Sequence, residues 1–240
     1  MSCLNSPFTV SLHYFFETDR SFFFVSTFVD GKNLSELLNK EEYMEEEAAK
    51  FYATQVLLAL EYLHNFNILY RDLKPENLIV DTTGFIKLVD FSISKMIKNR
   101  TYTFCGTPEY MAPEIIERKG YNLSVDWWSF GVFIYELCSG FTPFFSRVVD
   151  NIFKNILNCD VKYPKRFSNE LRDLINNLLN KELTERFVTN FENIFNLKSH
   201  EWFKNVNWEL IANRAVRPRH IPGFTHLDKL DTVAIQKLLQ

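Results

Sequence analysis

The sequence has little of several features that mark particular classes of protein. Only seven of its 240 residues are glycine, and no two of them have the Gly-x-Gly spacing of a phosphate-binding loop. The four cysteines form no Cys-x-x-Cys pair, and the five histidines stand too far apart to complete a zinc site. The sequence therefore contains no glycine-rich phosphate loop and no zinc motif. We interpret the cysteines as reduced thiols of a cytosolic or nuclear protein.

Strong net charge and long apolar runs are lacking as well. The formal net charge is -3, which predicts no general surface for nucleic acid or for an anionic membrane. No signal-peptide pattern opens the sequence, and the apolar run at residues 22–25 is far too short to cross a bilayer. We expect a soluble intracellular protein, in the cytoplasm, the nucleus or both, with neither nucleic acid nor a membrane as its partner.

The composition that remains is that of an ordinary globular protein. Hydrophobic residues make up 46% of the chain and charged residues 24%, so 240 residues can form one domain or two closely packed lobes. The order of apolar patterns is a β-rich front followed by a helical body, which predicts an α+β fold. The expected elements are a hairpin at 8–16 and 22–29, helices at 45–65, 126–137, 148–158 and 169–180, short helices near 191–196 and 199–204, and strands at 78–80 and 86–89.

Four smaller features refine this picture. Asn33 precedes a short apolar repeat and is expected to cap a helix there. The glutamates at 45–47 open the long helix, and we interpret them as compensating its dipole rather than as a cation site. The helix at 126–137 is apolar all round, which indicates a central, buried position. Residues 90–113 have few regular apolar repeats and are expected to form a long ordered loop.

The most informative stretch is Tyr-Arg-Asp-Leu-Lys-Pro-Glu-Asn at residues 70–77, followed 13 residues later by Asp90-Phe91. Phosphoryl transfer needs a base for the attacking hydroxyl, and Asp72 can accept its proton. Lys74 lies two residues further on and can reach a phosphate, while Asn77 and Asp90 offer the oxygen ligands that Mg²⁺ prefers. Charged groups on an ordinary surface loop do not explain so many fixed offsets.

This pattern resembles the catalytic loop and the metal-binding loop of eukaryotic protein kinases. Further matches are the run Phe-Cys-Gly-Thr-Pro-Glu-Tyr-Met-Ala-Pro-Glu at 104–114 and the Asp-Trp-Trp-Ser-Phe-Gly run at 126–131. Tyr70 before the Arg-Asp pair is typical of the AGC group, and within it of the cAMP-dependent catalytic subunits. The resemblance covers residues 7 to 223. It implies a protein-kinase-like fold with a mainly helical C-lobe and a truncated β N-lobe, divided at 1–30 (N-lobe remnant), 31–204 (C-lobe) and 205–240 (C-terminal tail).

The resemblance also implies roles for individual residues. Thr103 would be the activation-loop phosphosite, paired with Arg71 and Lys95 through charge-assisted hydrogen bonds. Glu114 and Arg186 would form a buried ion pair. The substrate side would consist of acids that bind upstream arginines, an apolar pocket for the residue after the target, and Thr107: Glu76, Glu109 and Glu136, with Phe104, Pro108 and Met111. Val29 and Ile79 would join Asn77 and Asp90 in binding ATP.

The chain departs from this family in several places. It has no glycine-rich loop, no strand lysine for the α- and β-phosphates and no helical glutamate to pair with that lysine. We therefore expect either a partial gene product or a kinase relative that has lost catalysis. Ser92 follows Asp90-Phe91 where the family has glycine; serine at a positive φ would cost about 1–2 kcal/mol, so the loop is expected to favour a different conformation. Asn33 replaces a glutamate that binds a substrate arginine, Ser26 is a small residue behind the adenine pocket, and Tyr102 replaces a tryptophan used to dock a regulatory subunit.

Two functions follow from these observations. The first is a serine/threonine protein kinase of the cAMP-dependent type, which uses ATP and Mg²⁺ and acts on proteins with an upstream arginine. The alternative is a catalytically inactive fragment or pseudokinase that binds peptides or a regulatory subunit. A cAMP-binding regulatory subunit is left open as a partner in both cases, and Tyr102 is expected to weaken its binding. The retained Asp72, Lys74, Asn77 and Asp90 favour the first function, and the absent phosphate loop favours the second.

Overall fold

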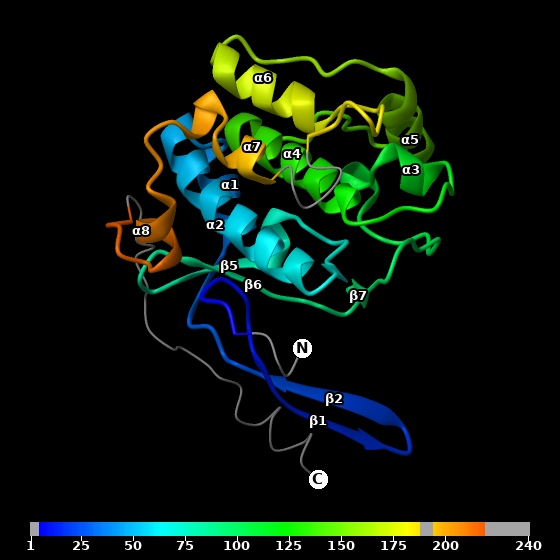
Figure 1. Cartoon of the computed structure of the whole chain (residues 1–240), viewed down its shortest axis with the longest axis vertical. Coiled ribbons are helices and arrows are strands. Elements are labelled where there is room, and N and C mark those ends of the chain that lie inside the picture. The colour runs from blue at the N-terminus through cyan, green and yellow to red at the C-terminus, as the bar shows by residue number, and fades with distance from the viewer. Residues whose placement is uncertain (1–4, 188–193, 219–240) are drawn as a thin grey trace.

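The computed structural model describes residues 5–187 and 194–218. A helical body forms most of it, and a β-hairpin projects from one end of this body (Figure 1). The strands, in chain order, are β1 (Leu12–Thr18), β2 (Ser21–Ser26), β3 (Gly31–Asn33), β4 (Ile68–Leu69), β5 (Leu78–Asp81), β6 (Ile86–Leu88) and β7 (Lys95–Met96). The helices are α1 (Leu34–Glu41), α2 (Glu46–Asn65), α3 (Pro113–Ile116), α4 (Ser124–Ser139), α5 (Val149–Asn158), α6 (Asn169–Leu178), α7 (Ile194–Lys198) and α8 (Trp208–Ala212), with 3₁₀ turns η1 (Pro75–Asn77), η2 (Pro108–Tyr110) and η4 (Glu201–Phe203).

The hairpin is shorter than its apolar pattern predicts. β1 and β2 pair antiparallel from Leu12 opposite Ser26 to Thr18 opposite Ser21. Residues 8–10, which we expected in the first strand, instead lie along β6, where Thr9 forms a parallel bridge with Leu88. The physical reason is burial: Phe8 is 1% exposed in the core, and the backbone of Leu88 bonds both Phe8 and Val10.

Two small sheets support the loops that follow the hairpin. β5 lies between β3 and β6 in an antiparallel three-stranded sheet, and β4 pairs with β7. Asn33 ends β3 and caps α1, because its Oδ1 accepts from the backbone N–H of Ser35 at 2.9 Å. This confirms the cap. The strands at β4 and β7 are two residues long and therefore give no periodic signal in the sequence.

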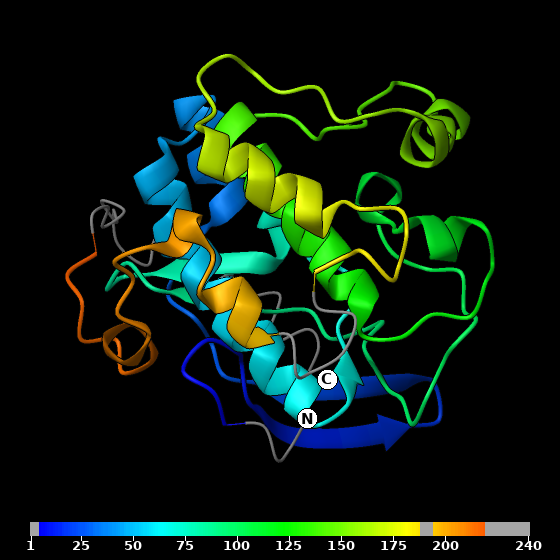
Figure 2. The same cartoon turned by 45° about the horizontal axis from the view of Figure 1, so that its top comes forward.

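The core of the body is organised around α4. Every residue of α4 except Glu136 is buried, which confirms the central position expected from its apolar character. The helices α2 and α6 pack against it, and Gly131 lets α6 approach closely, since a Cβ there would lie 2.9 Å from Leu178 Cβ. In Figure 2, α6 runs alongside α4 and partly in front of it.

The predicted elements can now be compared with the structure. The long helices are confirmed to within two residues at most ends, and the α+β order is confirmed. The short helix expected near 191–196 is described from Ile194. Residues 188–193 and 219–240 lie outside the described residues, and the latter range includes most of the expected tail.

Glu46 has a more specific role than dipole compensation. Its carboxylate accepts from the backbone N–H and the hydroxyl of Ser168 and from Trp202 Nε1, and so links α2 to α6 and η4. Among the described helices, none combines the length and apolar character that a membrane crossing needs.

Candidate active site

The loop at 70–77 is anchored to α4 by a single buried carboxylate. Asp126 accepts from the backbone N–H of Tyr70 and of Arg71, both at 2.9 Å, and lies 2.8 Å from His64 Nε2 of α2. Arg71 has φ 73°, in the left-handed region that a non-glycine residue adopts only when its surroundings impose it. The bond to Asp126, together with the 2.6 Å bond from Arg71 Nε to Ile93 O, holds this conformation and fixes where Asp72 points.

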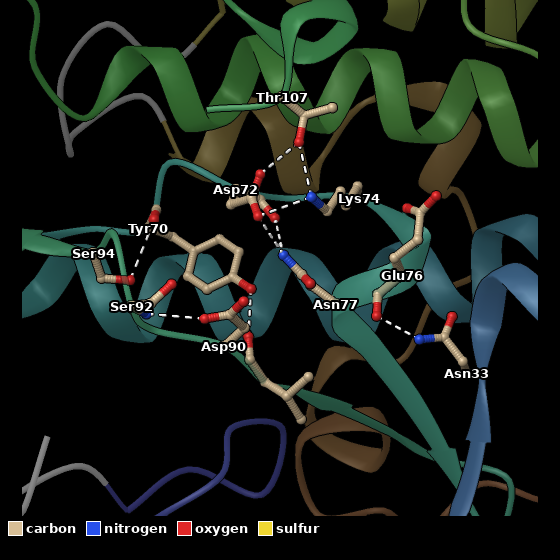
Figure 3. A network of polar contacts seen from close by, with 11 residues as sticks. Asn33, Tyr70, Asp72, Lys74, Glu76, Asn77, Asp90, Ser92, Ser94 and Thr107 are labelled. Atoms are coloured by element: carbon tan, nitrogen blue, oxygen red, sulfur yellow. Dashed lines mark hydrogen bonds and ion pairs between the residues drawn. The ribbon is translucent and has the colours of Figure 1, made fainter. Parts of the chain in front are cut away.

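Asp72 lies at the centre of a polar network (Figure 3). The hydroxyl of Thr107 donates to Asp72 Oδ1 at 2.7 Å, and Asn77 Nδ2 donates to Oδ2 at 2.8 Å. Lys74 Nζ lies 3.0 Å from Oδ2 and also donates to Thr107 at 2.8 Å. Burial opposes ionisation of Asp72, but the bonds from Thr107, Lys74 and Asn77 outweigh it and lower its pKa. The carboxylate is therefore ionised at neutral pH.

Asn77 and Asp90 lie at the ends of the neighbouring strands β5 and β6. Asn77 is buried and directs its Nδ2 at Asp72, while Asp90 is exposed and follows β6. Tyr70, whose ring packs edge-on against Phe91, donates its hydroxyl to Val89 O and so fixes the backbone just before Asp90. In Figure 3 the Tyr70 hydroxyl points toward Asp90.

Ser92 avoids the strain that a positive φ would impose on it. The positive φ in this loop belongs to Asp90, at 54°, and Ser92 is not among the described residues with positive φ. Asp tolerates this region because its short side chain bonds the local backbone, and here Asp90 Oδ1 accepts from Ser92 N at 3.0 Å. The substitution of serine at position 92 therefore does not carry the cost that the sequence suggested.

The donor set fits a divalent cation. Asp90 and Asn77 offer one carboxylate and one amide oxygen, and the bonds from Asn77 Nδ2 to Asp72 leave its Oδ1 available for a ligand. Mg²⁺ is usually held by one or two carboxylates while its other positions go to water and substrate phosphates. This explains why the described residues contain no cluster of three or more His, Cys, Asp or Glu side chains able to hold a metal alone.

A cavity of about 460 Å³ lies between the hairpin and the loop at 90–92. Its walls are mostly apolar, with Asp90 and two serines at its edge, and it is lined by Val10, Leu12, Phe24, Ser26, Asp90, Phe91 and Ser92. Ser26, which the resemblance places behind the adenine pocket, is one of the lining residues. Val29 and Ile79, expected in the nucleotide pocket, do not line this cavity. Val10, Leu12 and Phe24 were missed, although alternation along the two strands puts Leu12, Phe24 and Ser26 on one face.

The three predicted arginine-binding acids lie close enough to influence one another. Burial raises the pKa of Glu136 to about 8, and the charges of Glu76 and Glu109 add to this effect. Tyr110 donates its hydroxyl to Glu136, and Thr142 donates to Glu109 at 2.5 Å. The side chain of Asn33 is neutral and adds no charge to this group. Its amide donates a hydrogen bond to the backbone carbonyl of Glu76. Burial and these neighbouring charges therefore favour the protonated form of Glu136 at neutral pH.

The segment at 95–105 differs in detail from the expectation for a phosphosite. Thr103 is exposed, and Lys95 Nζ donates to Thr101 at 3.0 Å instead of to Thr103. Arg71 reaches the Tyr121 hydroxyl at 3.3 Å, and that hydroxyl donates to Thr103 O at 2.6 Å. The two cations predicted to pair with Thr103 therefore bond its neighbours: Lys95 bonds the hydroxyl of Thr101, and Arg71 bonds the hydroxyl of Tyr121.

The residues expected in an apolar pocket lie on the segment that leads to Glu114, the acidic partner of the predicted ion pair. Phe104 is 43% exposed and contacts Phe153 of α5, while Met111 is buried and Pro108 begins η2. The guanidinium of Arg186 binds Glu114 through two bonds, at 2.7 and 3.0 Å, with both side chains buried. The ion pair predicted between these residues is therefore present.

Comparison with known proteins agrees with this geometry. The family model described as "Protein kinase domain" matches residues 1–203. This chain is a member of the protein kinase family. It is 41% identical over 92% of its length to cAMP-dependent protein kinase type 3 of Saccharomyces cerevisiae, covering 56% of that protein. It is 41% identical over 90% of its length to a cAMP-dependent protein kinase catalytic subunit of Arthrobotrys oligospora, covering 42% of it, and 40% identical over 91% to the mouse catalytic subunit PRKX, covering 62%.

The match covers only part of each of these relatives. The chain spans about half the length of the curated relatives it matches. The kinase fold and membership of the serine/threonine kinase family follow from the match, and an ATP site with a divalent metal is general to the domain.

Proposed function

We propose that this chain forms the catalytic body of a serine/threonine protein kinase of the cAMP-dependent type. The observation that carries the proposal is the Asp72 carboxylate, held ionised by Thr107, Lys74 and Asn77 in a loop anchored to Asp126. A positioned carboxylate orients the attacking hydroxyl of a serine or threonine and accepts its proton, an effect of about 10²–10⁴-fold. The printed names of the relatives support the same reaction class.

Asn77 and Asp90 would hold Mg²⁺, with ATP in the cavity beside the hairpin. Val29 and Ile79 stay candidates for contact with the nucleotide outside the lining of this cavity. When bound, Mg-ATP supplies the γ-phosphoryl group and cancels part of its charge. Lys74 places a cation within 3.0 Å of Asp72 and so stabilises negative charge that develops beside the base. We assign Lys74, Asn77, Ile79 and Asp90 to a unit at 31–204, preceded by a unit at 1–30 that contains Val29 and followed by a tail at 205–240.

The substrate class is a protein with arginine upstream of the target residue. Glu76, Glu109 and Glu136 would receive the arginine, because a guanidinium pairs bidentately with a carboxylate and would favour ionisation of Glu136. Phe104, Pro108, Met111 and Thr107 would contact the target and the residue after it. Phosphorylation of Thr103 would add charge beside Lys95 and Arg71 and order this segment. A cAMP-binding regulatory subunit is proposed as a partner by analogy with the relatives' names.

A second function is favoured because different parts of the fold hold the two halves of the candidate site. The acidic group and Met111 sit on the helical body, whereas the walls of the cavity at Leu12, Phe24 and Ser26 come from the hairpin. The sequence also has no glycine-rich loop to cover phosphates. A chain that binds arginine-containing peptides without phosphorylating them, as a peptide-binding module, is consistent with this arrangement.

One experiment separates the two functions. The purified chain is given Mg-ATP and an Arg-Arg-x-Ser peptide, and phosphate transfer is measured beside peptide affinity. A kinase transfers phosphate and loses at least about 10²-fold of its rate in Asp72→Asn, while the exposed-surface control Asp150→Asn keeps it. A binding module shows peptide affinity that falls in Glu109→Gln, with no transfer and no rise in melting temperature on adding Mg-ATP. A chain with neither activity contradicts both proposals.

A further inference from the structure

Hydroxyl groups hold two of the three predicted arginine-binding acids. Tyr110 of η2 donates its hydroxyl to Glu136 of α4. Thr142 Oγ1 donates to Glu109 Oε2 at 2.5 Å. Glu109 is the neighbour of Tyr110 on η2, and Ser129 of α4 fixes this turn by donating to Tyr110 O at 2.9 Å. The bond from Thr142, which has no role in the function proposed above, therefore joins a firmly held turn to the chain that follows α4.

Thr142 reaches Glu109 because the chain reverses at the end of α4. Gly140, the residue after the helix, has φ 85° and donates its backbone N–H to Glu136 O at 2.7 Å. This left-handed conformation is a common way to end a helix, and it favours glycine. A Cβ at Gly140 would also collide with Glu42 O, so no side chain fits there without a shift of the backbone. The reversal brings Thr142 beside an acid that lies 33 residues earlier in the sequence.

The position of the Thr142 hydroxyl is fixed before any ligand binds. Thr142 is 3% exposed, so its hydroxyl needs a partner inside the protein, and the Glu109 carboxylate is that partner. Pro143 restricts the backbone of the preceding residue to extended conformations, and the β-branched side chain of threonine has few rotamers. Glu109 is half-buried and its side chain is long, so without this donor its carboxylate could adopt several orientations. The bond therefore orders the carboxylate.

We propose that Thr142 is a positioning residue for substrate recognition, which holds the Glu109 carboxylate ready for an arginine of the substrate. The inference rests on the substrate class proposed above. A guanidinium pairs with a carboxylate in a fixed planar geometry, so a carboxylate that is already ordered loses less freedom when arginine binds. Ordering one flexible side chain on binding weakens affinity about 2- to 12-fold. The bond from Thr142 leaves room for the guanidinium, because a carboxylate has about four lone-pair sites.

Peptide affinity tests this role. The dissociation constant of the full 240-residue chain for an Arg-Arg-x-Ser peptide is measured by titration calorimetry. Thr142→Val keeps the branching of the side chain and removes the donor, so the dissociation constant should rise about 5-fold. Thr142→Ser keeps the hydroxyl and should stay within about 2-fold of the original chain. The control Thr54→Val removes a buried hydroxyl that donates to Phe51 O on α2, and it should lower the melting temperature without changing the affinity.

A second background separates positioning from packing. In Glu109→Ala the carboxylate is gone, so adding Thr142→Val should change the dissociation constant by less than about 2-fold. An equal loss with and without Glu109 would mean that Thr142 acts through packing, and it would overturn the inference. Unchanged affinity in Thr142→Val, or a loss in Thr142→Ser as large as in Thr142→Val, would overturn it as well while leaving the substrate class intact. If the original chain has no affinity for the peptide, the substrate class is wrong and the role of Thr142 falls with it.

Discussion

The helical body and the hairpin use the same kind of residue in opposite ways. On α4, Trp128, Phe130 and Phe133 are fully buried against α2 and α6. On the hairpin, Phe15 and Phe24 are 53% and 66% exposed although their strand pairing is regular. An apolar pattern therefore specifies what kind of element forms, whereas burial depends on what packs against it.

The candidate active site spans both regions. Asp72, Lys74 and Asn77 belong to a network that ends on Asp126 in the core of the body, so their arrangement does not depend on the hairpin. The cavity at Asp90 takes Leu12, Phe24 and Ser26 from the hairpin. The substrate side of the site is therefore expected to be rigid, and the nucleotide side is expected to follow the stability of the hairpin.

The strongest test of the body is Arg186→Ala. This change removes the partner of buried Glu114 and leaves its carboxylate unpaired in the core. Breaking a buried pair on one side costs about 3–5 kcal/mol, which we expect as a fall in the free energy of unfolding measured with urea. Phosphate transfer or peptide affinity should fall with it, because Glu114 begins the helix that follows the segment at 103–111.

Lys119→Ala is the matched control, since it breaks the exposed Lys119–Glu117 pair only eight residues from Met111. It should leave the urea midpoint unchanged. The double change Glu114→Leu with Arg186→Met should recover part of the loss, because an apolar pair removes the buried charge. If Arg186→Ala cost no more than Lys119→Ala, the ion pair would not be holding the segment to the body.

The sequence was informative where chemistry is carried by fixed offsets, and less so where packing decides. Asp72, Lys74, Asn77 and Asp90 are placed together as their spacing predicts. The prediction that residues 8–10 belong to the first strand of the hairpin was wrong. The burial of Phe8 places them along β6 although the apolar pattern continues into β1. Lys95 bonds Thr101 instead of the predicted Thr103. This partner depends on how the loop brings residues 95 and 101 together, which no local sequence pattern encodes.

The next test uses Glu136, a residue of the body whose ionised form is destabilised by burial and by neighbouring carboxylates. Its pKa is raised to about 8 from 4.5, so the contribution of Glu136 to stability is greatest below pH 4.5 and is lost as the pH rises toward 8. Glu136→Gln removes this loss because the amide never ionises. We expect its melting temperature to exceed that of the original chain by about 10 °C at pH 8.5 and by roughly half as much at pH 6.

Glu209→Gln provides the control, because Glu209 is exposed on α8. Its melting temperature should follow that of the original chain at both pH values. A Glu136→Gln variant with the same pH dependence as the original chain would show that Glu136 is ionised without cost, and that the acidic group is more open to solvent than its burial indicates.

The smallest effect is expected in the hairpin, and it is the sharpest test of the comparison. Phe15→Ala removes a ring that is 53% exposed, so the free energy of unfolding of the body, measured at low protein concentration, should change by less than about 0.5 kcal/mol. Phe130→Ala removes a ring of the same size that is fully buried, and the same measurement should show a loss of about 3–5 kcal/mol. Comparable losses in the two variants would mean that hairpin and body unfold as one unit. The nucleotide side of the site would then be as firmly held as the substrate side, because Leu12 and Phe24 could not move away from Asp90 without unfolding the core.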